Sequence, residues 1–210
     1  MSTNTPPPRR HYQFERYMTK ARWISFWHQL DEINKLHPDR VLEIGPGPGL
    51  FKSIAGSLGI VVETLDLSPD LQPDFVASAT TLPFADSSYD VVCAFQMLEH
   101  IPYEESLRAF AEMARVARKQ VVISLPDAQI LWRYRFHLPV FGAVNFSLPS
   151  PRLQLPVLQQ NDEHYWEVNV RGYPLSRISE DFSKLMPLTK TYRVPENPYH
   201  RFFVFAHTRG

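Results

Sequence analysis

The strongest constraint on the fold is a glycine-rich segment, VLEIGPGPGL, at positions 41–50. Residues typical of a buried strand lead into three glycines spaced G-x-G-x-G, and helical residues follow. Because glycine has no Cβ, the backbone of such a turn can approach a ligand closely. The helix that follows presents N–H groups without intrahelical partners. The segment therefore predicts a strand–turn–helix unit with a ligand bound at the turn.

Short apolar runs alternate with helical stretches along the chain. The apolar runs lie at 40–44, 60–65, 75–77, 89–95 and 120–125. Helical periodicity covers 18–36, 50–58, 103–118 and 174–184. Two more strands are expected at 189–194 and 201–206, close enough in sequence to pair antiparallel. The pattern predicts an α/β protein: a Rossmann-like, doubly wound, seven-stranded sheet, mostly parallel with an antiparallel C-terminal strand pair.

One domain accounts for most of the chain. Residues 1–15 are polar and proline-rich, which predicts a disordered leader, and residues 16–210 show no second domain boundary. The single Cys93 lies in an apolar run and is expected to be a buried thiol. Because neither a signal peptide nor an apolar run of about 18 residues is present, a cytoplasmic protein is expected.

The charge balance disfavours one class of partner. Lysine and arginine together number 22, as do aspartate and glutamate. Proteins that bind nucleic acid usually carry a basic excess. We therefore expect no nucleic-acid partner, and nothing in the sequence indicates the oligomeric state.

Two acidic residues help to distinguish between cofactors. Glu43 stands two residues before the first glycine, where it would attract a cationic or amine-bearing ligand and repel a pyrophosphate. Asp66 ends the next strand, where a carboxylate can accept both hydroxyls of a ribose, or can act only as a turn residue. The G-x-G-x-G spacing also differs from the G-x-G-x-x-G of many dinucleotide-binding proteins, which argues against an NAD-dependent oxidoreductase.

These motifs, in this order, resemble those of class I S-adenosylmethionine-dependent methyltransferases of the type 11 group. The matching segments are VLEIGPGPG (41–49), TLDLS (64–68), TTLPFADSSYDVV (80–92), FQMLEHIP (95–102) and KQVVISLP (119–126). The resemblance is firm over about 38–126. It implies S-adenosyl-L-methionine as the cofactor.

The resemblance also implies roles for individual residues. The methionine part of the cofactor would be held by Glu43, Gly45, Gly47 and Gly49. Asp66 would bind the ribose and Leu67 would flank the adenine. The segment that contains Ser78, Ala79 and Leu82 would run along the adenine, and Phe95 and Gln96 would lie beside the methionine and sulfonium. Ser78 stands where many relatives have an acidic residue.

Glu99 and His100 follow the fourth strand, at the edge of the sheet where ligands are expected. His100 is a candidate general base, or the pair only fixes the loop. Some relatives bind a divalent metal there through Glu-x-x-Glu-His. Because Gln96 replaces the first glutamate and is a poorer ligand, no metal site is predicted.

Residues 126–173 contain five prolines and many aromatic residues. In this fold such an insertion usually forms part of the acceptor pocket, so a substrate lid is predicted; the alternative is ordinary packing on the sheet. His164, in the run DEHYWE at 162–167, is a second candidate base.

The sequence thus predicts a methyltransferase for a small molecule or a glycan or lipid intermediate. The alternatives are a non-catalytic S-adenosylmethionine-binding subunit and, less favoured, the oxidoreductase.

Overall fold

A computed structural model describes residues 17–140, 142–151, 155–158 and 164–207. The predicted leader at 1–15 lies outside these residues. The strands are β1 Val41–Ile44, β2 Val62–Asp66, β3 Phe75–Val76, β4 Tyr89–Phe95, β5 Ala117–Pro126, β6 Leu131–Leu138, β7 Gly142–Pro149, β8 Leu188–Arg193 and β9 His200–Ala206. The α-helices are α2 Lys20–Asn34, α3 Leu50–Ser57, α4 Tyr103–Val116 and α5 Leu175–Ser183, and the short 3₁₀ helices are η2 Pro69–Leu71 and η3 Leu98–His100.

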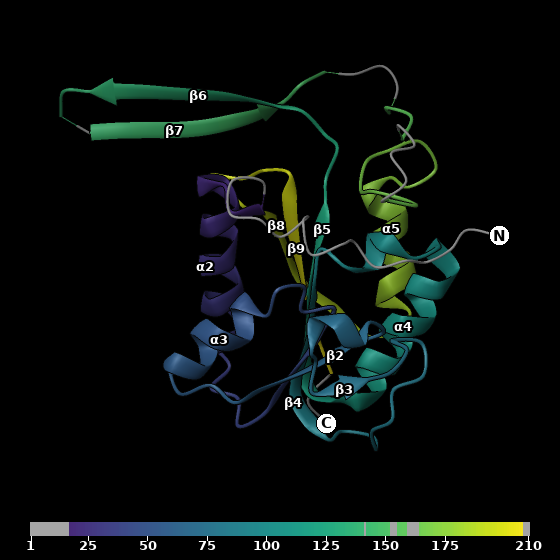
Figure 1. The fold of residues 1–210 in the computed structure, drawn as a ribbon. Coiled ribbons are helices and arrows are strands. Elements are labelled where there is room, and N and C mark those ends of the chain that lie inside the picture. Colours follow the sequence, from purple (N-terminus) through teal and green to yellow (C-terminus); the bar gives the residue numbers. More distant parts are fainter. Residues whose placement is uncertain (1–16, 141, 152–154, 159–163, 208–210) are drawn as a thin grey trace.

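Seven of the strands form one sheet in the order β3-β2-β1-β4-β5-β9-β8 (Figure 1). The strands from β3 to β5 are parallel, and β9 is antiparallel to both β5 and β8. Every residue of β1 and β4 is buried, which is why these strands are largely apolar on both faces, with Glu43 and Asp90 as their acidic residues. The predicted fold class and its antiparallel C-terminal pair are confirmed.

Helices cover both faces of the sheet because neighbouring residues of a strand point to opposite sides. Leu42 of β1 belongs to a buried cluster with Phe110 of α4 and with side chains of α5. Val41 belongs to a second cluster with Phe26 of α2 and Phe51 of α3. Figure 1 shows α2 and α3 on one side of the sheet and α4 and α5 on the other. The sheet is therefore the middle of three layers.

The strand order reverses between β1 and β4. From β1 the chain passes through α3 to β2 on one side, and β4 leads through α4 to β5 on the other. In open parallel sheets the carboxyl ends of the strands at such a reversal diverge into a crevice that binds ligands. The glycine-rich turn follows β1 directly, so it lies at this crevice.

The insertion after β5 contains an antiparallel hairpin, β6–β7, which extends away from the sheet beyond the carboxyl end of β5 (Figure 1). Trp132 pairs with Leu148 and Phe136 with Val144, which places apolar residues on one face. Trp132 and Phe136 are each 48% exposed. No strand was predicted in this insertion, although the alternation of aromatic and basic residues in WRYRFHL is a strand pattern.

Candidate active site

A cavity of about 340 Å³ lies at the carboxyl ends of β1 and β2. Five residues expected to bind cofactor line it: Gly45, Asp66, Leu67, Ser78 and Ala79. The other lining residues are Ile44, Leu65, Ala77, Thr80, Met97, Ile101, Pro102 and Glu105. The motifs that are separate in sequence therefore meet around one cavity.

Two features require glycine at position 45: the backbone conformation and the lack of space for a side chain. Its φ is +69°, a left-handed conformation that side chains rarely adopt, and its N–H donates to the Leu65 carbonyl at 2.9 Å. A Cβ at this position would lie 2.3 Å from Cγ of Met97. Gly47 and Gly49 also have positive φ, 54° and 73°, but they turn the chain into α3 and do not line the cavity.

Glu43 lies beneath the turn, and its Oε2 atom is buried without a hydrogen-bond partner among the described residues. Burial raises the pKa of its carboxyl group to about 8, opposed in part by the charge of Lys52. A buried carboxylate without a partner is costly. The ammonium of a bound S-adenosylmethionine would supply the missing donor, so Glu43 fits its expected role although it does not line the cavity.

Asp66 lies at the cavity rim, where burial raises the pKa of its carboxyl group. Its Oδ1 atom accepts a hydrogen bond from the Ser68 N–H at 2.8 Å. This bond is the turn interaction considered above, and it also fixes the orientation of the carboxylate. The exposed Leu67 follows at the rim, where an adenine would find an apolar contact.

The segment after β3 forms the opposite wall. Ser78 and Thr80 line the cavity, and their hydroxyl oxygens lie 2.8 Å apart. Two hydroxyl-bearing side chains therefore lie at this wall. Leu82 instead packs in the core, and its N–H donates to Oε2 of Glu112 at 2.8 Å.

Phe95 and Gln96, at the end of β4, do not line the cavity. Phe95 packs in the core against Phe51 and Phe202. Gln96 has a φ of 53°, and its side-chain amide nitrogen lies 3.2 Å from Oγ of Ser124. Strained residues of this kind concentrate at functional sites. Gln96 turns the chain so that Met97 faces the cavity.

The loop after β4 contributes residues that the sequence analysis did not single out. Met97, Ile101 and Pro102 line the cavity. All three lie within the matching segment FQMLEHIP, but nothing in the sequence indicates which of its side chains face the ligand. The same loop contains η3 and therefore Glu99 and His100.

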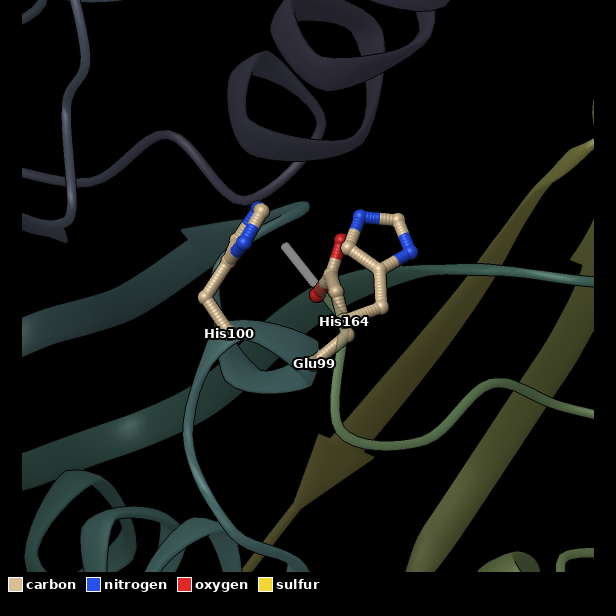
Figure 2. A group of neighbouring side chains, drawn as sticks. All are labelled: Glu99, His100 and His164. Carbon is tan, nitrogen blue, oxygen red and sulfur yellow. The ribbon is translucent and has the colours of Figure 1, made fainter. Parts of the chain in front are cut away.

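Glu99, His100 and His164 form one cluster beside this loop (Figure 2). One ligand-type atom from each residue lies within 4.8 Å of the others, and the two imidazole rings are 4.8 Å apart between centroids. The N–H of Tyr165 donates to the Glu99 carbonyl at 2.8 Å, which fastens the insertion to η3. The two candidate bases, distant in sequence, are thus brought together.

A chain of hydrogen bonds runs from His164 through Glu167 to Tyr199. Nδ1 of His164 lies 2.7 Å from Oε1 of Glu167, and the hydroxyl of Tyr199 donates to the same oxygen at 2.8 Å. Glu99 is fully buried, and burial raises the pKa of its carboxyl group to about 8. Neither of its carboxylate oxygens has a hydrogen-bond partner among the described residues.

Comparison with known proteins gives a family match. A family model described as a methyltransferase domain matches residues 42–125. A demethylmenaquinone methyltransferase from Renibacterium salmoninarum is 34% identical over 106 residues, which are 44% of this chain and 43% of that protein. The chain therefore spans less than half the length of the curated relatives it matches.

Solved structures share the fold at low sequence identity. The magnesium protoporphyrin IX methyltransferase of Synechocystis, solved with S-adenosylhomocysteine, is 13% identical with a TM-score of 0.61, covering 90% of this chain and 84% of that one. The 1,6-didemethyltoxoflavin-N1-methyltransferase of Burkholderia thailandensis is 15% identical with a TM-score of 0.57, covering 98% and 92%. Residues 42–125 therefore match a methyltransferase domain, and the chain shares the fold of these methyltransferases.

Proposed function

We propose that the protein transfers the methyl group of S-adenosylmethionine to a hydroxyl of a small molecule or of a glycan or lipid intermediate. One observation carries the proposal: a single loop lines the cofactor cavity with Met97 and Ile101 and also carries Glu99 and His100 of the polar cluster. The cofactor cavity and a cluster able to handle a proton are therefore adjacent.

The chain's own residues hold the cofactor at one end of this arrangement. Glu43 accepts from the ammonium group and Asp66 accepts from the ribose hydroxyls, while Gly45 leaves room for the Met97 side chain that lines the cavity. The bound cofactor supplies an activated methyl group on a sulfonium. Orientation of the acceptor against this group can contribute about 7–11 kcal/mol.

The polar cluster serves the acceptor end. His100 or His164 takes the proton of the acceptor hydroxyl as its oxygen attacks the methyl carbon, which can add about 10²–10⁴-fold to the rate. Glu167 orients the His164 ring through the 2.7 Å contact and stabilises its protonated form. His164 is therefore a candidate base whose ring is held in a fixed orientation.

We also propose that residues 126–173 contribute to the acceptor pocket as a lid. The support is that this insertion returns to η3 and delivers His164 and Tyr165 beside Glu99. None of the described hairpin side chains lines the cofactor cavity, and the side chains of Arg133, Arg135 and Phe146 lie outside the described set.

The names of relatives favour a small acceptor. Those proteins are named for demethylmenaquinone, magnesium protoporphyrin IX and 1,6-didemethyltoxoflavin, all small molecules. The sequence has no excess of basic residues, which argues against nucleic acid as the acceptor. No helix in the described ranges combines the length and the apolar character needed to cross a bilayer. A cytoplasmic location stays a prediction.

Calorimetry tests the cofactor half. Asp66→Asn should weaken binding of S-adenosylmethionine by about 1–3 kcal/mol because the ribose loses a charged acceptor. The control is Asp70→Asn, on the exposed surface of the neighbouring η2, which should bind like the wild type. Equal affinities for both variants would contradict the assigned cofactor position.

Label transfer tests the reaction. Protein is incubated with S-adenosylmethionine carrying a labelled methyl group and with separate fractions of cell extract. Label is expected in small molecules, glycans or lipids. Label only in nucleic acid would refute the acceptor class, whereas cofactor binding without any transfer would support a non-catalytic subunit.

A further inference from the structure

We propose that Glu99, His100 and His164 bind a divalent transition-metal ion, with Zn²⁺ as the model ion, and that this ion binds the acceptor hydroxyl. The inference rests on the proposed methyl transfer, because it assigns the polar cluster its chemistry. It departs from the expectation of no metal site. That expectation considered only Gln96, Glu99 and His100, whereas the fold adds His164 as a third donor.

The geometry of the three side chains suits one ion. Figure 2 shows the Glu99 carboxylate between the two imidazole rings. Ligand atoms bound at about 2.0–2.2 Å to a shared ion lie roughly 3–3.5 Å from one another. The present limit of 4.8 Å requires the side chains to close by only about 1–2 Å, within the range of small side-chain rotations.

The burial of Glu99 points independently to a missing cation. The residue is 0% exposed, and both carboxylate oxygens lack a hydrogen-bond partner among the described residues. Two other buried carboxylates do have partners. Glu167 accepts from Tyr199 and contacts His164, and Asp127 forms ion pairs with two arginines. A carboxylate left without donors in such surroundings is costly, and a bound cation removes that cost.

The chain of hydrogen bonds behind His164 is the arrangement that metal-binding histidines usually have. When Nδ1 donates to Oε1 of Glu167, the ring tautomer is set, so Nε2 is the nitrogen that would bind the ion. Tyr199 in turn holds the Glu167 carboxylate. Glu167 and Tyr199 are therefore positioning residues: they touch neither the ion nor the acceptor.

The donor set determines the kind of ion. Two imidazoles and one carboxylate suit Zn²⁺ and other first-row transition ions, whereas Mg²⁺ and Ca²⁺ prefer oxygen ligands. Three protein ligands leave a coordination position open, as in catalytic metal sites. Because the adjoining loop lines the cofactor cavity, an acceptor oxygen at that position would lie near the methyl donor.

The step balances without any further reactant. The acceptor hydroxyl binds the ion, which lowers the pKa of the hydroxyl, and its proton leaves to solvent. An oxygen lone pair then forms a bond to the methyl carbon while the carbon–sulfur bond breaks. Its electron pair stays on sulfur, so the products are the methyl ether, neutral S-adenosylhomocysteine and one proton. In this scheme His100 and His164 hold the ion instead of taking the proton.

Calorimetric titration of the full, chelator-treated protein with Zn²⁺ tests the inference without cofactor or acceptor. One ion per chain is expected. His164→Gln should weaken binding at least tenfold, and Glu167→Gln about 10- to 100-fold, because the second variant removes only the orienting carboxylate. His137→Ala, an exposed histidine of the hairpin, should leave the affinity unchanged and controls for surface binding.

Thermal unfolding keeps the test decisive if a variant folds poorly. Zn²⁺ should raise the unfolding midpoint of the wild type and of His137→Ala but not that of His164→Gln. No binding by the wild type, or equal loss in His137→Ala and His164→Gln, would overturn the metal site. Such a result would overturn only the metal site, and methyl transfer with a histidine base would stand. Failure of the Asp66→Asn test would instead overturn the proposed cofactor position.

Discussion

Replacing Glu43 by glutamine should change how stability depends on pH. The wild-type carboxyl group has an ordinary pKa of 4.5 in the unfolded chain, and burial raises that value to about 8 in the folded protein. Below pH 4.5 both states hold the proton and the group has no effect. Between the two values the folded protein keeps a proton that the unfolded chain releases, so stability falls as the pH rises.

The magnitude follows from the width of this interval. From 4.5 to about 8 is about 3.5 pH units, and at about 1.4 kcal/mol per unit the loss reaches about 5 kcal/mol above pH 8. Glutamine does not titrate, so Glu43→Gln lacks this loss. Glu99 has the same direction of pKa change, and taking the difference between the two proteins cancels its effect.

Urea unfolding of both proteins at about pH 5 and about pH 9 measures the difference. The free energy of unfolding of Glu43→Gln relative to wild type should rise by about 4 kcal/mol between these pH values, because a small part of the loss has already occurred at pH 5. A relative stability that is the same at both pH values would show that the Glu43 carboxylate has a partner in the folded state. Repeating the measurement with saturating S-adenosylmethionine should reduce the difference, because the ligand ammonium then pairs with Glu43.

Two further predictions concern the turn and the insertion. Gly45→Ala should lower the free energy of unfolding by about 2–4 kcal/mol and weaken cofactor binding in calorimetry, because a strained φ is combined with the close contact to Met97. Gly49 has a similar φ, but a Cβ there would have nothing within 4 Å. Gly49→Ala should therefore lower the free energy of unfolding by only about 1–2 kcal/mol. Equal costs would refute the contact argument. Replacing residues 131–149 by a short glycine–serine linker should shift the unfolding midpoint by only about 2 °C, because none of the hairpin side chains that the structure describes belongs to either buried cluster. A loss of cooperative unfolding in a thermal scan would show that the hairpin supports the sheet.

Local patterns were enough to predict the sheet and the cofactor turn. Continuous apolar runs identify strands that are buried on both faces, and the glycine spacing after the first run marks a ligand-binding turn. These features depend on residues that are close together in the sequence, so a short window of the chain is enough to predict them. The same reasoning missed the strands β6 and β7, although their alternation was visible in the sequence.

The tertiary structure alone decided which side chains meet. Leu82 and Phe95 come from segments that match cofactor motifs, yet they pack in the core, while Met97 faces the cavity because Gln96 adopts a left-handed conformation. His164 reaches Glu99 only because the insertion folds back onto η3. Contacts between distant segments depend on how the chain closes long loops and packs its layers, and no local pattern in a single sequence encodes that closure.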